Sequence, residues 1–351
     1  MTTRSPAAAQ RVTVILPCRN EAAHISACLD SILGSAHPAE RLEVLVVDGM
    51  SDDGTRELIE QYAKTYPRIR MLDNPNRVVP TALNIGIRAA TGDVIVRMDG
   101  HVVYPPEYIP RLVDALLADG ADNVGGCLIT LPSDGSPVAQ AIAIAMSHPF
   151  GVGFARFRIG ARDAQDVDTV PFGCFRRSLF KRVGLFDEEL VRNQDDEFNH
   201  RIITKGGRVR LIPDVVCYYY ARGSLGKAAR MFYQYGAFKP LVARKVGRIM
   251  TVRQLVPALF VASLIGTALG TLLWPPFAAI GAGIAAAYAF CIGALAVPVA
   301  RSHGLRTALW LTVALPVIHL SYGFGFLRGL RDGVFGRSRW RDDPAAVPLS
   351  R

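Results

Sequence analysis

The amino-acid sequence predicts an α/β fold with a mainly parallel sheet, followed by C-terminal transmembrane helices. Short β-branched runs alternate with segments of helical spacing over the first hundred residues. This alternation is typical of a parallel sheet covered by helices on both faces. Half of the chain is hydrophobic, and after residue 250 three long apolar runs each reach the roughly 20 residues that cross a bilayer.

The first part of the sheet is predicted from four short runs rich in Val, Ile and Leu. These runs are residues 12–17, 42–48, 69–73 and 92–98. The segments between them place apolar side chains at helical spacing, as Ile25, Leu29 and Ile32 do. Helices are therefore expected between the strands.

The second part is predicted from a strand, two helices and a final strand. In that order, these are residues 167–173, 175–184, 197–207 and 208–220. Residues 130–165 have weak periodicity, and we expect a mobile loop or a short helix over the site there.

Polar side chains follow three of the predicted strands. They are Arg19, Asn20 and Glu21 after the first, Asp48 after the second, and Asp99 and His101 after the fourth. Because a parallel sheet binds its ligand at the carboxyl ends of its strands, we expect these residues to line the site. No G-x-G-x-x-G follows the first strand and no G-x-x-x-x-G-K-[ST] occurs, which argues against a dinucleotide site and a P-loop.

Two of these carboxylates have a specific chemical use. Asp48 can accept hydrogen bonds from a base or a ribose held over the sheet edge, whereas the neighbouring Ser51, Asp52 and Thr55 are typical helix-capping residues. Asp99 can hold a divalent cation against a diphosphate. Taken alone, an Asp-Gly-His sequence is also an ordinary turn, so the residue types leave both interpretations open.

The distribution of charge indicates a membrane and argues against a nucleic-acid partner. The net charge is +10, from 40 basic and 30 acidic residues, and no Asp or Glu occurs between Asp214 and Asp332. The Arg residues of this stretch flank apolar runs, as expected at the cytoplasmic face of a membrane. The six cysteines are scattered without a C-x-x-C pair, and we expect them to be reduced.

Four regions follow from these patterns. We predict a cytoplasmic domain over residues 1–222, a basic amphipathic interfacial helix over 223–250, a transmembrane region of two to three spans over 251–330 and a basic tail over 331–351. The N-terminus lacks the apolar core of a signal peptide, so the first domain is expected to stay in the cytoplasm. Basic and aromatic side chains are interleaved in residues 224–248, which favours a helix on the membrane surface over a buried helix.

The three apolar runs leave two topologies open. They are Leu255–Trp274, Pro276–Ala300 and Thr307–Leu327. The first two are joined without a charge and form an expected hairpin that returns to the cytoplasmic side at Arg301 and Arg306. A full third crossing would place five arginines outside, against the positive-inside tendency: Arg328, Arg331, Arg337, Arg339 and Arg341. The sequence fits three spans, and it fits two spans with a re-entrant segment equally well.

Six motifs occur in an order and spacing that point to one known family. They are PCRNE at 17–21, VDGMSDDGT at 47–55, LNIGIRAATGD at 83–93, RMDGH at 97–101, PFGCFRRSLFKRVGLFDEEL at 171–190 and NQDDEFNHR at 193–201. Over about residues 11–220 the chain resembles glycosyltransferase family 2, with the GT-A fold. The resemblance implies an inverting transferase that takes a sugar from a nucleotide diphosphate, usually UDP, with Mg2+ or Mn2+.

The resemblance also assigns the nucleotide-sugar site. It implies that Pro17, Arg19, Glu21 and Asn84 lie near the nucleotide sugar and that Asp48 binds the uracil ring.

Asp99 corresponds to the first residue of the family's Asp-x-Asp metal motif, and His101 replaces the second Asp. Either the imidazole binds the ion, or Asp99 and other groups hold it less tightly. Histidine is a plausible ligand for Mn2+ and a poor one for Mg2+, which prefers oxygen. We therefore predict Mn2+ dependence, with Asp99 and His101 as the metal ligands.

Gln194 and Asp195 correspond to a Glu-Asp pair in the family, of which the Asp is the general base. An inverting displacement needs a carboxylate on the face opposite the leaving diphosphate. Asp195 is the predicted base and Asp196 the second choice, although Asp195 could instead cap a helix that we expect to begin near Glu197. The resemblance implies that Arg201 faces the diphosphate or braces the acidic loop, and a solvated helix Arg fits the sequence equally well.

These expectations lead to one function and two alternatives. The resemblance implies a membrane-anchored transferase that moves a hexose, with glucose expected, from a UDP-sugar to a polyprenyl-diphosphate-linked saccharide in exopolysaccharide or cell-surface glycan synthesis. The first alternative is a polyprenyl-phosphate sugar synthase, whose acceptor phosphate is already ionised and needs no general base. The second is a non-catalytic membrane scaffold that retains a degenerate transferase domain.

Overall fold

The computed structural model describes residues 6–249 and 251–334 of the protein. They form two units. The N-terminal unit contains residues 6–129 and 156–219, and the helical unit contains the remaining described residues, including the segment 130–155. Most of the expected basic tail at 331–351 lies outside the described residues, together with Arg337, Arg339 and Arg341.

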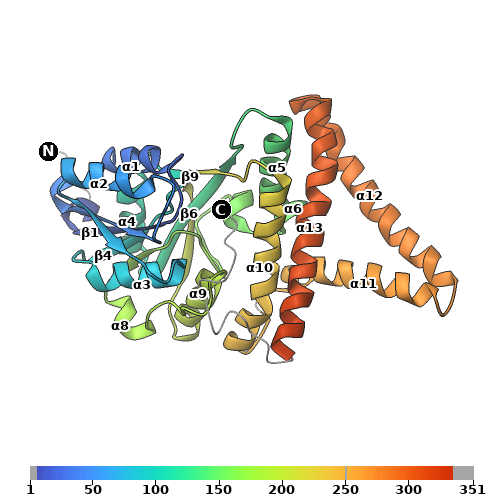
Figure 1. The fold of residues 1–351 in the computed structure, drawn as a ribbon. Helices are drawn as coiled ribbons and strands as arrows, with labels where there is room; N and C mark the ends of the chain where they lie inside the picture. Colours follow the sequence, from blue (N-terminus) through green and yellow to red (C-terminus); the bar gives the residue numbers. More distant parts are fainter. Residues whose placement is uncertain (1–5, 250, 335–351) are drawn as a thin grey trace. The chain divides into compact units, whose positions relative to one another are not determined.

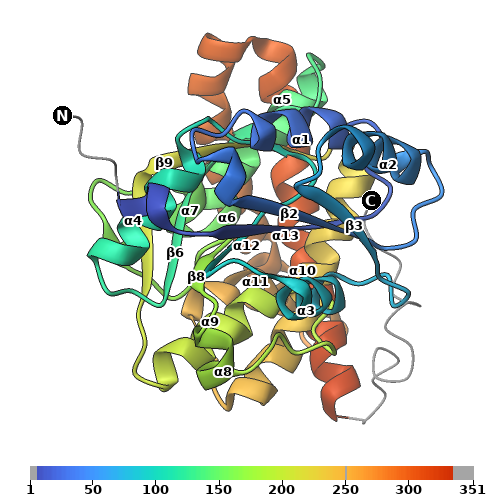
Figure 2. The same cartoon turned by 90° about the vertical axis from the view of Figure 1, so that its left-hand side faces the viewer.

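The N-terminal unit is built on a mixed nine-stranded sheet (Figure 1, Figure 2). Eight of its strands follow the order β3-β2-β1-β4-β8-β6-β9-β5. The first four are parallel: β3 (Ile69–Asp73), β2 (Leu42–Asp48), β1 (Val12–Cys18) and β4 (Val94–Arg97). They coincide with the four predicted runs, and the predicted fold class is confirmed.

Helices cover the parallel strands, of which β1, β2 and β4 are mostly apolar and buried. Every residue of β1 is buried, as expected for a strand covered on both faces. The helices that follow the four parallel strands are α1 (Ile25–Leu33), α2 (Thr55–Thr65), α3 (Val79–Ala89) and α4 (Tyr108–Ala118). Gly86 lets α3 approach β1 closely, since a Cβ at this position would lie 2.5 Å from Ile15 Cγ2.

The second half of the sheet is antiparallel where β8 joins β4 and β6. Its strands are β5 (Val102–Val103), β6 (Asn123–Leu131), β7 (Gln165–Asp166), β8 (Cys174–Arg176) and β9 (Val209–Tyr220). The predicted strand over 167–173 is wrong, and the strand begins at Cys174 instead. Pro171 has no N–H for a ladder, and Phe172 has a φ of 48°, outside the β region.

An aromatic cluster packs the acidic motif NQDDEFNHR, residues 193–201, onto this half of the sheet. Phe198 of α9 (Gln194–Thr204) lies 4.3 Å from Phe186 and 5.7 Å from Phe175, measured between ring centroids. Phe180 of α8 (Leu179–Val183) completes the cluster. Stacked and edge-to-face rings of this kind fix relative orientation, so the start of α9 is held near the end of β4.

The helical unit contains the apolar segments. Its main helices are α5 (Pro137–Ser147), α6 (Pro149–Val152), α10 (Leu225–Val246), α11 (Val256–Thr271), α12 (Pro276–His303) and α13 (Leu305–Val334). Within residues 6–249 and 251–334, three helices are long and apolar enough to cross a membrane, namely Val252–Thr271, Pro276–His303 and Leu305–Gly333. The expected C-terminal apolar helices are therefore confirmed.

Helix α10 has features of both a membrane-surface helix and a buried helix, the two alternatives considered from its sequence. Met231, Phe232 and Phe238 are buried, and the helix lies beside α13 (Figure 1). Lys227 and Arg230 near its beginning are exposed. The helix is therefore amphipathic and partly buried, and its attachment to a membrane surface stays a prediction.

Replacing Gly86 by Ala should destabilise the N-terminal unit. The added methyl group would press on Ile15, a fully buried β-branched side chain that has no space to move. Overpacking of this kind costs about 1–3 kcal/mol, which thermal unfolding in detergent would report as a lower Tm. Gly135→Ala is the matched control, because nothing lies within 4 Å of its added Cβ. Equal Tm values for the two variants would contradict this packing argument.

Candidate active site

The loops after β1 and β4 lie side by side at the carboxyl edge of the parallel strands. Cys18 and Asp48 are paired in register at the ends of β1 and β2, and Arg97 ends β4. A Cβ on Gly100 would lie 3.5 Å from side-chain atoms of Cys18 and Glu21. Parallel strand register therefore brings the PCRNE and RMDGH motifs together.

Asp48 organises the loop that follows β2. Its side chain is completely buried, and it accepts hydrogen bonds from the backbone N–H of Ser51 at 3.0 Å and from the Ser51 hydroxyl at 2.5 Å. Arg56 Nη1 donates to Asp48 at 2.7 Å, and Arg56 Nη2 donates to Asp73 at 2.8 Å. These contacts shape the VDGMSDDGT loop, and contact of Asp48 with a uracil ring stays a prediction.

The capping interpretation of Ser51, Asp52 and Thr55 is wrong. Helix α2 begins after Gly54 without a side-chain cap. The three side chains instead accept hydrogen bonds from the PCRNE loop: the Asn20 N–H donates to Ser51 Oγ at 2.9 Å, Asn20 Nδ2 to Asp52 at 2.9 Å, and the Glu21 N–H to Thr55 Oγ1 at 2.8 Å. The two loops are thereby tied together. Pro17 is buried in β1 and Arg19 is half-buried in the loop after it.

Arg97 joins the predicted metal carboxylate to the predicted base. Its guanidinium forms an ion pair with Asp195 through Nη1, and its Nη2 lies 3.3 Å from Asp99 Oδ1. The Arg97 side chain is 7% exposed, and its guanidinium carbon lies 5.6 Å from the ring centroid of Phe172. Two carboxylates from different motifs thus share one buried cation, and each keeps a second oxygen for a ligand.

His101 is buried beside Glu21. Its Nδ1 lies 3.1 Å from Glu21 Oε1, and the two side chains are 6% and 4% exposed. The imidazole also packs edge-on against Tyr219, with ring centroids 5.2 Å apart. A carboxylate that accepts the Nδ1 proton leaves Nε2 with its lone pair, which is the tautomer that ligates metals.

Asp195 lies in the first turn of α9, after the N-cap residue Asn193. The expectation that it caps a helix beginning near Glu197 is therefore wrong, because the helix begins at Gln194. Burial raises the pKa of the Asp195 carboxyl, and the neighbouring Asp99 and Asp196 carboxylates act in the same direction, whereas Arg97 opposes them. A raised pKa makes the carboxylate a better proton acceptor once it is ionised.

Asn84 and Arg201 hold the chain around residues 183–188. Asn84 Nδ2 donates to the Phe186 carbonyl at 2.9 Å and to Glu188 at 2.8 Å. Arg201 pairs with Glu197 and donates to the carbonyls of Val183 and Leu185 at 3.0 and 2.7 Å. These contacts brace the segment before α9, and a direct role of either side chain with the nucleotide sugar stays a prediction.

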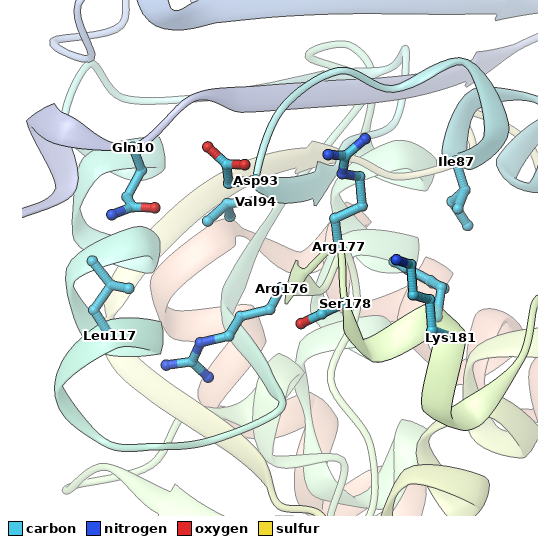
Figure 3. Close-up of a pocket in the computed structure, with 10 residues that line it drawn as sticks. Gln10, Ile87, Asp93, Val94, Leu117, Arg176, Arg177, Ser178 and Lys181 are labelled. Atoms are coloured by element: carbon cyan, nitrogen blue, oxygen red, sulfur yellow. The ribbon is translucent and has the colours of Figure 1, made fainter.

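A surface hollow lies at the opposite end of β4, away from this cluster (Figure 3). Asp93, Val94, Arg177 and Lys181 are among its lining residues. Arg177 Nη1 donates to the Ala90 carbonyl at 3.1 Å, so a structural contact already uses this cation. Because β4 runs from Val94 to Arg97, the hollow is not at the carboxyl edge where the polar motifs gather.

Comparison with known proteins establishes the family. The model of glycosyl transferase family 2 matches residues 13–185. The succinoglycan biosynthesis protein ExoA of Rhizobium meliloti is 30% identical over 321 residues, which cover 91% of this chain and 94% of ExoA. The chain belongs to glycosyltransferase family 2. The motifs RMDGH, SHPFGVG and RNQDDEFNHR indicate ExoA within the family, and the comparison confirms that similarity.

Other relatives and solved structures agree with this family 2 assignment. The dolichyl N-acetyl-alpha-D-glucosaminyl phosphate 3-beta-D-2,3-diacetamido-2,3-dideoxy-beta-D-glucuronosyltransferase of Methanococcus voltae is 27% identical over 67% of this chain and 74% of its own length. The mannosyltransferase PcManGT of Pyrobaculum calidifontis has a TM-score of 0.56 and 23% identity, over 92% of this chain and 88% of its own. The last comparison shows the GT-A-like fold. The protein is thus a membrane-associated family 2 glycosyltransferase of polysaccharide or glycan synthesis.

Arg97 is the site residue that the sequence interpretation missed. The signal was present, because Arg97 is a charged residue at the end of the otherwise apolar strand VIVR. A buried arginine needs carboxylate partners, but its sequence position does not say which acids come from elsewhere in the chain.

Replacing Arg97 by Met should lower both Tm and turnover. The variant leaves two carboxylates without their shared cation, and breaking a buried pair costs about 3–5 kcal/mol. Arg97→Lys should recover part of the Tm but less of kcat, because an ammonium cannot reach both carboxylates in the planar geometry of a guanidinium. The matched control is Arg11→Met, whose pair with Asp93 is exposed and is worth about 0–1 kcal/mol. Equal losses from Arg97→Met and Arg11→Met would show that Arg97 does not organise the site.

Proposed function

We propose that the protein is an inverting, metal-dependent hexosyltransferase of the cytoplasmic membrane. It takes a hexose, with glucose as the expected sugar, from a UDP-sugar and transfers it to a polyprenyl-diphosphate-linked saccharide, with its catalytic domain in the cytoplasm. The observation that carries the proposal is the Asp99–Arg97–Asp195 arrangement, because Asp99 is the proposed donor-side carboxylate, Asp195 is the proposed acceptor-side carboxylate, and both pair with one arginine at one sheet edge.

The residues present fit a divalent cation bound together with the nucleotide. Asp99 would supply a carboxylate oxygen, and His101, whose Nδ1 pairs with Glu21, would supply Nε2 as a nitrogen ligand. Among the described residues, no group of three or more His, Cys, Asp or Glu side chains could hold a metal, so the donor diphosphate is expected to complete the coordination. The cation, when bound, would neutralise charge on the leaving diphosphate.

Asp195 is the proposed general base. The acceptor hydroxyl oxygen attacks the anomeric carbon while the bond from that carbon to the diphosphate oxygen breaks. The hydroxyl proton passes to Asp195, and the nucleoside diphosphate leaves from the opposite face. Because Arg97 holds Oδ1 of Asp195, Oδ2 is the oxygen available for this proton.

The names of two relatives belong to polysaccharide or glycan synthesis, and one of these names supports a lipid-linked saccharide as the acceptor. ExoA is similar over nearly the whole chain, and the Methanococcus relative carries the name of a transferase acting on a dolichyl-linked sugar phosphate. A dolichol-phosphate mannosyltransferase of Pyrococcus furiosus is 33% identical over only 32% of this chain. The polyprenyl-phosphate sugar synthase therefore remains the second candidate.

Asp195→Asn should abolish sugar transfer. General-base catalysis contributes about 10²–10⁴-fold, so release of UDP from the preferred UDP-sugar, measured with membrane lipid extract and Mn2+, should fall by that factor. Asp196→Asn is the matched control and should retain most of the rate. Release that survives Asp195→Asn would favour the polyprenyl-phosphate synthase. The scaffold alternative predicts that the unmodified protein neither turns over nor binds UDP in calorimetry.

Metal preference tests the role of His101. The enzyme should be more active with Mn2+ than with Mg2+, because nitrogen ligands suit Mn2+ better. His101→Asp should raise activity with Mg2+ relative to Mn2+, and calorimetry with UDP should show the same change in metal preference for binding. Full Mg2+ activity combined with unaltered kinetics of His101→Ala would exclude His101 as a ligand.

A further inference from the structure

The path of α13 conflicts with a simple third crossing. Its length and hydropathy suffice for a span, yet a crossing would separate Arg328 and Arg331 from Arg301 and Arg306, against the positive-inside tendency. The packing of α13 within the helical unit bears on whether α13 crosses the membrane. It shows which charged groups of neighbouring helices lie level with the middle of the apolar run Thr307–Leu327.

Helix α10 lies parallel to α13 in close contact with it. A Cβ on Gly325 would lie 2.1 Å from the carbonyl oxygen of Tyr233, and one on Gly329 would lie 2.2 Å from that of Ala237. In this register the exposed Lys227 of α10 comes level with His319 of α13. A perpendicular α13 would therefore carry this lysine, and Arg230 one turn later, into the hydrocarbon core, where charges are costly.

The first half of α13 is covered by α5 and α6, which also bring polar groups to it. Thr307 Oγ1 lies 3.0 Å from Gln140 Oε1, and His319 Nε2 lies 2.9 Å from the carbonyl oxygen of Phe150. One face of α13 is thus covered by protein along its length, while Leu309, Val313 and Phe324 remain exposed.

The start of α11 adds a third charge at the same level. Gly323 of α13 meets α11 at Pro257, whose carbonyl oxygen would lie 2.4 Å from an added Cβ. One turn earlier, Arg253 donates to the Phe154 carbonyl at 2.7 Å. Lys227, Arg230 and Arg253 therefore all lie near the middle of the run Thr307–Leu327, where a spanning helix would need apolar neighbours.

Helices α11 and α12 differ from α13 in the charge of their surroundings and in their burial. No charged residue occurs between Arg253 and Arg301, and only 6% of the apolar stretch of α12 is buried. Both helices extend away from α13 and meet at the turn before Pro276 (Figure 1). At that turn Leu272 and Leu273 are 81% and 90% exposed, so the hairpin needs an apolar environment over its whole length.

We propose that, among the described helices, only the α11–α12 hairpin penetrates the bilayer. Helix α13 then lies along the interface of the leaflet from which the hairpin enters and to which it returns. The exposed Leu309, Val313 and Phe324 then face the acyl chains, while Arg306 and Arg328 reach anionic head groups. All the described basic residues of the helical unit stay on one side, so the positive-inside conflict disappears. The apolar face of α13 is thus in contact with the lipid of that leaflet.

Cysteine labelling from the two sides of the membrane tests the sidedness. In full-length protein carrying Cys291→Ala, Ser302→Cys at the end of α12 and Gly333→Cys at the end of α13 would be probed with a membrane-impermeant maleimide in sealed vesicles. Ser302 is exposed, and nothing lies within 4 Å of a Cβ on Gly333, so both variants should fold. We expect label at both positions from the same side, and its loss at both from the other side. Labelling from opposite sides would overturn the proposal.

Depth measurement separates an interfacial α13 from a re-entrant one. A fluorophore on Val313→Cys or Phe324→Cys, in vesicles containing anionic lipid, should be quenched most by shallow lipid-attached quenchers, to a similar extent at both positions. Gly283→Cys in α12 is the deep control, since its added side chain also meets open space. Quenching of Val313→Cys by the deep quencher to the extent seen at Gly283→Cys would overturn the interfacial placement.

Discussion

The buried guanidinium of Arg97 is the interaction on which the site depends. It sits at the end of a parallel strand and binds carboxylates from two motifs that are about a hundred residues apart in the sequence. Such a cation is tolerated in the interior only because its partners are charged and close. The proposed metal ligand Asp99 and the proposed general base Asp195 therefore share one fixed point, so a shift of one carboxylate is transmitted to the other through Arg97.

The surrounding loops are held by hydrogen bonds and ion pairs at the carboxyl edge of the sheet. Asp48 fixes its own loop through Ser51 and Arg56, and Asn20 bonds to the same loop. On the other side, Arg201 braces the segment before α9. A site built in this way is pre-organised, so binding energy is not needed to assemble it.

The sequence predicted the parallel half of the sheet well, because its strands are short, mostly apolar runs and polar residues follow three of them. It predicted the antiparallel half less well: the apparent strand at 167–173 is interrupted by Pro171 and Phe172, whose backbone geometry is not visible in an apolar pattern. Asp195 and Asp99 could be named from motifs, whereas their connection through Arg97 required the three-dimensional structure. The placement of α13 likewise depends on which charges lie beside it, and hydropathy does not carry that information.

The configuration of the product tests the central claim most directly. The purified enzyme would be supplied with its preferred UDP-sugar and lipid extract, and the glycolipid product analysed by NMR for its new anomeric linkage. An inverting transfer by Asp195 predicts a β-linked hexose on a saccharide hydroxyl when the donor is an α-linked UDP-hexose. A product with retained α configuration, or a hexose attached directly to the lipid phosphate, would contradict the account.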